Sequence, residues 1–178
     1  MMWLPKELRD EMSMHARIAL PNESGGVLMG YDAGNGVVVE AVIGPGPRAL
    51  HEQAGFVPDY EFQQREISRV YETSGRRHTY LGDWHSHPGG RPMLSRKDKR
   101  TLRAIAKHRP ARAPNPVMVI LIGDEPCELA AWRCLPRRIL RGQFRCRYER
   151  LEIVLRNKAG HPRGHLRKGR LCSATFGK

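Results

Sequence analysis

The sequence has no apolar run of about eighteen residues, so no transmembrane helix is expected. Its opening segment, MMWLPKELRDEM, becomes charged at once and lacks the apolar core of a signal peptide. The four cysteines form neither a C-x-x-C pair nor a compact disulfide spacing: they are Cys127, Cys134, Cys146 and Cys172. Without a secretion signal, these thiols are expected to be reduced. Together the absences predict a cytoplasmic protein with no membrane partner.

Acidic residues are scarce in only one part of the chain. Overall, 31 Lys and Arg face 18 Asp and Glu, but the segment 133–178 holds 14 basic residues against two glutamates. The first 132 residues are therefore nearly neutral, with 17 basic and 16 acidic groups. Two interpretations of the basic end stay open. It is either a solvated strand face followed by a floppy tail, or a docking surface for an acidic protein, RNA or DNA.

The 178 residues suffice for one domain with a hydrophobic core and are too few for two domains that each bury a core of their own. Apolar periodicity predicts a helix over 6–19, a second that Asp59 caps and that ends near Ser74, and a third from Ser95 to Pro110. Short β-rich runs predict strands at 25–31, 37–43, 78–85, 117–122, 129–135 and 144–155. The turn between the first two of these strands predicts a hairpin.

The order of these elements predicts a mixed α/β (α+β) domain with one main sheet, over residues 1–156. Residues 157–178 contain four glycines, many cations and little periodicity, and are interpreted as a basic C-terminal tail. The segment 44–58, with its glycines and prolines, is predicted to be an ordered surface loop. Such a long loop is usually functional.

Two histidines flank Ser86 near the end of a predicted strand. Side chains two positions apart on a strand point to the same face, so His85 and His87 can converge on one ion. Asp98 lies in the first turn of the helix that starts at Ser95, where its side chain can point back toward the strand end. Two histidines and a carboxylate leave a fourth tetrahedral position for water, which is typical of a catalytic zinc site.

A general base is needed beside such a zinc ion, because a proton must pass from water to the leaving amine. Glu23, just before the first of the two hairpin strands, is the candidate. Each feature also has a simpler explanation. A lone His-x-His is often two polar side chains at a strand end, and Ser95-x-x-Asp98 resembles a helix N-cap with an acidic residue in the first turn. Glu23 alone could be a surface carboxylate.

The combination of these residues, however, resembles a known motif. Glu23 before an apolar strand, the run HSHP from His85, a seven-residue spacer after His87 and the run SRKD from Ser95 match the pattern E…H-S/T-H-x7-S-x-x-D. This is the motif of the JAMM (MPN-plus, JAB-like) zinc metalloproteases. The resemblance covers roughly residues 5–135 and extends to the flanking segments PNESGGVLMG, FVPD and YLGDWHSHPGG. These variants are most similar to bacterial stand-alone JAB peptidases.

The resemblance implies a β-sheet wrapped by helices and one Zn2+ ion held by His85, His87 and Asp98. It also implies that Ser95 donates a hydrogen bond to the tetrahedral oxyanion, as a hydroxyl can. The implied reaction is cleavage of an amide after the C-terminus of a ubiquitin-like protein, in deconjugation or in precursor processing. Such peptidases are often encoded beside ubiquitin-like activating and conjugating (E1- and E2-like) proteins. Phe56, in the 44–58 loop, is a candidate substrate contact, with a core-anchor role as the favoured alternative.

Three other functions share parts of this pattern. An inactive MPN scaffold is disfavoured, because such scaffolds lose ligands and this chain keeps all of them. A protease that matures a sulfur-carrier protein uses the same site, so the motif does not separate it from a deconjugating enzyme. A nucleic-acid-binding JAB-related protein, in the manner of the RadC-like proteins, would use the basic C-terminus. No aromatic-rich strand or helix-turn-helix supports that function.

Overall fold

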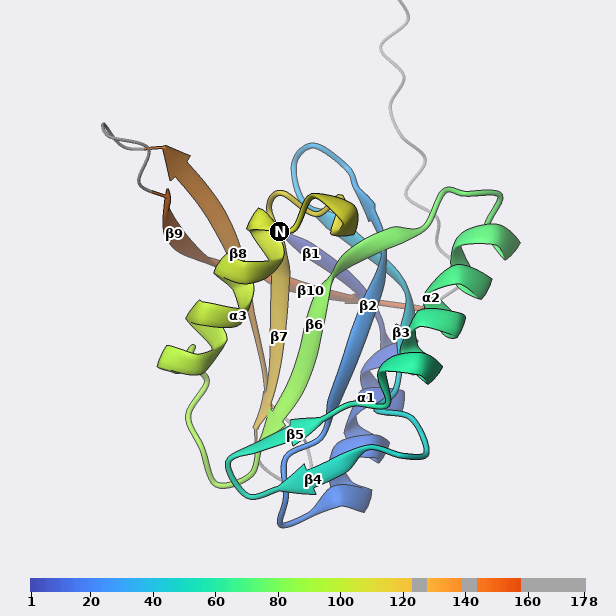
Figure 1. Cartoon of the computed structure of the whole chain (residues 1–178), viewed down its shortest axis with the longest axis vertical. Helices are drawn as coiled ribbons and strands as arrows, with labels where there is room; N and C mark the ends of the chain where they lie inside the picture. Colours follow the sequence, from blue (N-terminus) through green and yellow to red (C-terminus); the bar gives the residue numbers. More distant parts are fainter. Residues whose placement is uncertain (123–127, 139–143, 158–178) are drawn as a thin grey trace, which may run out of the picture.

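The computed structural model describes residues 1–122, 128–138 and 144–157 of the chain, and an eight-stranded mixed sheet forms its centre (Figure 1). The strand order across the sheet is β10-β1-β3-β2-β6-β7-β8-β9. These strands are β1 (Met2–Pro5), β2 (Gly25–Asp32), β3 (Val37–Ile43), β6 (Thr79–His87), β7 (Val117–Ile122), β8 (Glu128–Arg138), β9 (Phe144–Leu151) and β10 (Ile153–Arg156). Three α-helices accompany the sheet: α1 (Lys6–Ala19), α2 (Tyr60–Thr73) and α3 (Arg96–Lys107). The predicted mixed α+β fold with one main sheet is confirmed.

The centre of the sheet consists of β2, β6 and β7. β2 pairs antiparallel with β3 and with β6, while β6 and β7 run parallel. β7 has the sequence VMVILI, and its first five residues are buried. A continuous apolar run of this kind is typical of a strand covered on both faces. The predicted hairpin of β2 and β3 is present.

Helix α1 covers one face of the sheet. Leu8 and Met12 lie one helical turn apart and are buried, whereas most of the other positions of α1 reach solvent. This spacing of apolar residues places them on one stripe of the helix, which packs against the sheet. They join the largest core cluster, which contains Met2, Leu4, Leu28, Val37, Val39, Val42, Leu81, Trp84, Val117, Val119, Leu121, Ala131 and Leu151.

Helices α2 and α3 lie over the opposite face, on either side of β6 (Figure 1). α2 packs over β2 and β3 through a cluster that includes Val27, Met29 and Val70. α3 packs over β7 and β8 through Leu102 and Met118. Helix α2 contacts β6 in part, and a groove remains along this strand between α2 and α3. This groove positions the functional site.

The structure differs from the prediction in three elements. The 44–58 loop is partly ordered as a two-stranded hairpin, β4 (Leu50–Glu52) and β5 (Gly55–Val57). The single strand predicted over 144–155 is wrong, because the chain leaves β9 at Leu151 and β10 joins the other edge of the sheet beside β1. β1 was not predicted, since a four-residue strand has little pattern of its own and forms by pairing with β3 and β10, which are distant in sequence.

The remaining part of the chain includes a 3₁₀ turn over Arg109–Ala111, where the prediction ended the third helix. No helix within the described segments has the length and apolar character needed to cross a bilayer. The predicted basic tail lies outside the described residues, except for Asn157. Two of the four cysteines are described, Cys134 and Cys146, and both are free thiols.

Candidate active site

His85 and His87 occupy the C-terminal end of β6, as the sequence predicts. Their side chains share one face of the strand, and their Nε2 atoms lie 2.8 Å apart. Ser86 points to the other face and is buried, where its Oγ accepts a hydrogen bond from the backbone N–H of Ser24 at 3.0 Å. The Ser86 N–H in turn donates to the Ser24 carbonyl at 2.7 Å. This double link holds the segment that contains Glu23 beside the two histidines.

Asp98 reaches the histidines from the first turn of α3. Its Oδ1 lies 3.4 Å from Nε2 of His85, and its Oδ2 lies 3.7 Å from Nε2 of His87. The same carboxylate accepts a hydrogen bond from the backbone N–H of Ser95 at 2.7 Å, while the Oγ of Ser95 accepts one from the Asp98 N–H at 3.1 Å. This is a reciprocal capping box. The capping interpretation and the ligand interpretation of Asp98 are therefore both compatible with the structure.

The three side chains fit a metal ion. One ligand atom from each lies within 4.8 Å of the others. A tetrahedral ion with ligand distances near 2.0–2.2 Å separates its ligand atoms by roughly 3.3–3.6 Å, which the observed spacings bracket. Two imidazole nitrogens and a carboxylate oxygen that converge in this way are a donor set that suits a shared cation.

The protonation of this cluster also suits a metal. Burial lowers the pKa of His87, and the neighbouring His85 lowers it further, against opposing effects of Asp98 and the Arg91 carbonyl. Burial by itself would raise the pKa of Asp98, but hydrogen bonds and charge from His85, with the hydrogen bonds from Ser95, hold it well below its usual range. A neutral imidazole and an ionised carboxylate are the forms that bind metal ions.

Glu23 lies beside this cluster. Burial raises the pKa of its carboxyl group, the charges of His85 and Lys97 lower it, and the charge of Asp98 raises it. The β4–β5 hairpin fixes the Glu23 backbone: its N–H donates to the Glu52 carbonyl at 2.8 Å, and its carbonyl lies 2.9 Å from Nδ1 of His51. Sequence reasoning missed His51, whose role depends on a contact across 28 residues.

The hairpin also forms a wall of the site. The Phe56 ring covers Gly25, where even a Cβ atom would collide with the ring and with the Trp84 carbonyl. Phe56 is partly buried and lines the groove, so the structure brings it to the site that the sequence proposed for it. From the other side, the Nζ of Lys97 lies 3.5 Å from the carbonyl of Ala54 in the hairpin turn. Lys97 thus connects α3 to the hairpin next to the metal cluster.

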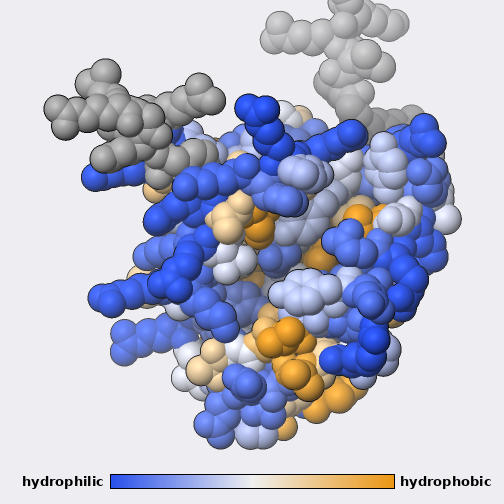
Figure 2. Space-filling view, viewed as in Figure 1, coloured by the Kyte–Doolittle hydropathy of each residue, from blue (hydrophilic) through white to orange (hydrophobic). Residues whose placement is uncertain are grey.

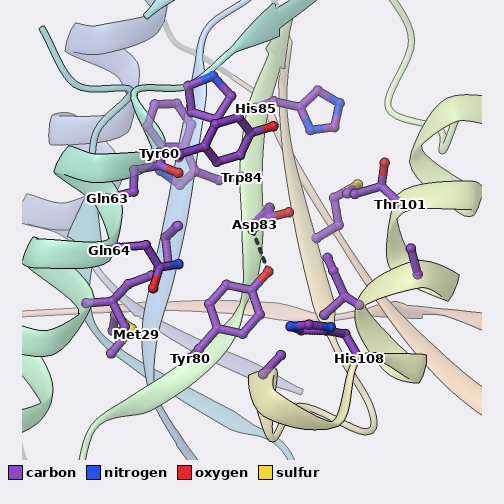
Figure 3. Close-up of a pocket in the computed structure, with 18 of the residues that line it drawn as sticks. Met29, Tyr60, Gln63, Gln64, Tyr80, Asp83, Trp84, His85, Thr101 and His108 are labelled. Carbon is purple, nitrogen blue, oxygen red and sulfur yellow. Dashed lines mark hydrogen bonds between the residues drawn. The ribbon is translucent and has the colours of Figure 1, made fainter. Parts of the chain in front are cut away.

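The groove has a volume of about 850 Å³ and extends from Glu23 and Asp98 along β6 to His108 and Arg112. Figure 2 shows this face hollowed between α2 and α3, with pale and apolar side chains in the hollow and charged ones along its rims. Figure 3 shows the groove floor, where Tyr80 and Asp83 of β6 lie between Gln64 and Met29 on one side and Thr101 and His108 on the other. A groove of this shape suits an extended chain.

Asp83 is a groove residue that sequence reasoning missed. It is half-buried, and the hydroxyl of Tyr80 donates a hydrogen bond to its Oδ1 at 2.6 Å. Burial raises the pKa of Asp83, which the Tyr80 hydrogen bond and the charge of His85 oppose. An aspartate inside the otherwise apolar strand start YLGDW, two positions before His85, was the available signal.

Two histidines at a strand end and a carboxylate in the following helix form a donor set for a metal ion, and a second carboxylate lies beside them. This arrangement is typical of metal-dependent hydrolases. Residues 5–135 match the family model of the prokaryotic homologues of the JAB domain, and the chain belongs to that family. The solution structure of a Desulfitobacterium hafniense protein has a TM-score of 0.59 at 26% identity, covering 88% of this chain and 94% of that one.

Relatives with named activities agree with this assignment. A probable metalloprotease of Sinorhizobium fredii is 41% identical over 128 residues, which cover 69% of this chain and 76% of that protein. Two proteins named CD-NTase/cGAS isopeptidase, from Vibrio cholerae and Enterobacter hormaechei, are 33% identical over 84 and 106 residues. These matches cover 47% and 58% of this chain, and 54% and 57% of those isopeptidases. They support a peptidase or isopeptidase with a bound metal.

Proposed function

We propose that the protein is a zinc-dependent isopeptidase or peptidase that cleaves after the C-terminus of a ubiquitin-like protein. The observation that carries the proposal is the convergence of His85, His87 and Asp98 beside Glu23 at one end of an extended groove. His85, His87 and Asp98 hold the ion. When bound, zinc supplies Lewis acidity toward a carbonyl oxygen and toward water.

Glu23 acts as the general base. Its carboxylate takes the proton of the attacking water and returns it to the departing lysine ε-amine or main-chain nitrogen. Burial raises the pKa of this carboxyl, which brings its basicity closer to the operating pH. The backbone contacts of Glu23 with Glu52 and His51 hold it against the β4–β5 hairpin beside the metal cluster.

Ser95 supports the reaction from the start of α3. Its Oγ accepts a hydrogen bond from the Asp98 N–H, and a hydroxyl that accepts in this way still has its own proton to donate. We assign that proton to the oxygen that becomes negative in the tetrahedral intermediate. The capping box keeps the Ser95 side chain close to the ligand Asp98.

The substrate assignment rests on the shape of the groove. A channel over β6, flanked at the metal end by Phe56 and Lys97, admits an extended chain more readily than a folded surface. A small terminal residue suits this end, since glycine has no Cβ to collide near the ion. Among the strands that the structure describes, β5 pairs with β4 alone, so its other edge can pair with the backbone of the tail. The relatives named isopeptidase support an amide linked to a lysine side chain.

One assay with three substrates tests the proposal. We expect a fusion of a ubiquitin-like domain to be cleaved after its terminal glycine, the same fusion ending in tryptophan to be cleaved far more slowly, and casein to be nearly inert. Glu23→Gln protein is the control for contaminating proteases. Equal rates on the two fusions, or preference for casein, would contradict the assigned substrate.

A further inference from the structure

One carboxylate in the groove is not used by the metal cluster. Three carboxylates line the groove among the described residues, Glu23, Asp83 and Asp98, and only Asp83 stands apart from the cluster. Its Oδ1 accepts the hydrogen bond from Tyr80. Within the segments that the structure describes, no ion pair joins Asp83 to a lysine or arginine. A half-buried carboxylate without a cationic partner retains much of its cost of desolvation.

The charge of His85, a residue of the metal cluster, acts on Asp83. Of the groove residues contributed by the two helices, Gln63 and Gln64 of α2 and Thr101 and Ile105 of α3 are neutral. Lys97 of α3 contacts the carbonyl of Ala54 instead. A carboxylate offers about four acceptor sites, of which the Tyr80 hydroxyl occupies one. In Figure 3 the Asp83 side chain is directed into the space between the two helices, so its remaining acceptor sites face the occupant of the groove.

The register of β6 locates Asp83 relative to the reaction. Asp83 and His85 are two residues apart, so their side chains share one face of the strand at a spacing of roughly 6.6 Å. An extended substrate lying along β6 has nearly the same rise for each residue. If its cleaved carbonyl lies at the metal cluster, then the side chain two residues earlier lies beside Asp83 and points to the same side as that of the terminal residue.

We propose that Asp83, oriented by Tyr80, is a subsite for a cationic side chain of the substrate tail, two residues before the residue whose carbonyl is cleaved. The ligand class is a guanidinium or ammonium group, which pairs with the free acceptor sites of the carboxylate. The proposal deepens the proposed function and rests on it for the direction of the tail. It adds a second selectivity to the requirement for a small terminal residue.

Binding of product peptides tests the subsite without turnover. The probes are fluorescent hexapeptides that end in a free glycine and carry either arginine or its neutral analogue citrulline at the third residue from the end. A third peptide carries arginine one position closer to the end, where an extended chain points it away from the floor. Affinities for the zinc-loaded full-length protein are measured by fluorescence anisotropy at low salt.

The first peptide should bind wild-type protein roughly ten- to a hundredfold more tightly than the other two, as expected for a charge-assisted hydrogen bond in a groove. In Asp83→Asn protein the three affinities should agree within about twofold. Tyr80→Phe keeps the carboxylate and should keep the preference for arginine. Asp10→Asn is the matched control, because it removes one exposed acidic charge from α1, on the other face of the sheet.

Equal affinity of wild-type protein for the three peptides, or no measurable binding of any of them, overturns the subsite. So does a preference that survives in Asp83→Asn. Should that variant not fold, the three-peptide comparison on wild-type protein still decides. Cleavage of the fusion protein without an arginine preference leaves the proposed function standing and removes the subsite. An Asp83-dependent preference for arginine without cleavage of any fusion supports the subsite and contradicts the proposed function.

Discussion

The carboxylate of Asp98 serves two structures at once. It completes the capping box of α3 with Ser95, and it faces the Nε2 atoms of both histidines. The start of α3 and the His85–His87–Asp98 group are thus one unit, in which the helix end places a carboxylate that could hold a metal ion. A cap is typically worth about 1 kcal/mol, so the interactions that orient Asp98 also stabilise the fold. The motif spacing S-x-x-D is the capping-box spacing for this reason.

Substitutions at single residues should separate the base from the ligands. Glu23→Gln should retain about one zinc ion per chain and lose turnover by about 10²- to 10⁴-fold, because an amide cannot accept the proton of water. His85→Ala should lose both zinc and turnover. The zinc content of each purified variant is measured by elemental analysis, and its cleavage rate is measured on the fusion substrate. A Glu23→Gln protein that cleaves at nearly the wild-type rate would show that Glu23 is not the base.

Some of these residues are predictable from sequence and others are not. Local rules, the strand alternation and the helix cap, place His85, His87 and Asp98 individually, and the combined motif predicts that they converge. Glu23 could be assigned only through the motif, since it lies more than sixty positions from the histidines along the chain. Tyr80 and Asp83 were missed because the sequence of the strand does not show that a groove between α2 and α3 exposes these two side chains.

At the scale of elements, Arg48 holds the junction between the 44–58 segment and α2 through ion pairs with Asp59 and Glu61. Arg48 Nε and Nη2 donate to the two carboxylate oxygens of Asp59, both at 3.1 Å, and the Phe62 N–H donates to Asp59 Oδ1 at 3.1 Å. Asp59 therefore caps α2, as predicted, and also ties the chain that leads to the β4–β5 hairpin. This contact fixes one end of the segment that holds Glu23.

The Arg48–Asp59 contact should make stability depend on pH. The hydrogen bond from Arg48 is the main cause that lowers the pKa of Asp59 to about 2, and the Phe62 N–H contributes against the effect of burial. An unfolded aspartate titrates near 3.9. The stabilisation is therefore complete above that value and is lost as the pH falls through about 2.

Asp59→Asn keeps a capping side chain but removes the charge. Its melting temperature should lie below that of wild-type protein at neutral pH, and the difference should shrink between about pH 4 and pH 2. Glu72→Gln is the control, since its ion pair with Arg76 is exposed on both sides and contributes little. A melting-temperature difference that does not change with pH would contradict the ionic origin of the effect.

The helices and inner strands were predicted more accurately than the outer strands. Helices α1, α2 and α3 follow from the periodicity of a contiguous segment. β1 and β10 do not, because their partner strands lie at opposite ends of the chain. The run from Phe144 to Arg156 is uniformly β-like, so its sequence does not reveal that Glu152 separates two strands at opposite edges of one sheet.

At the scale of the whole molecule, we expect the basic tail to be separable from the reaction. All described helices and strands end by Arg156, and ending the chain at residue 157 removes six Lys and Arg and no acidic residue. We expect such a protein to fold and to cleave a minimal peptide substrate at the wild-type rate. Docking of an acidic or nucleic-acid partner should weaken in a salt-dependent manner. Circular dichroism and peptide kinetics check the first expectation, and loss of folding would contradict it.

The position of β1 between β10 and β3 also bears on the order in which the protein folds. Met2 pairs with Ile153, and the Met2 N–H donates to the carbonyl of Glu152 at 2.7 Å. Contacts between residues this far apart close a long loop and form late. During refolding, pulsed hydrogen exchange should therefore protect amides of β2, β6 and β7 before that of Met2; simultaneous protection would contradict this order. Because β1 is synthesised long before β10, its edge on that side has no partner until β10 is made, and a nascent chain is exposed to mispairing there.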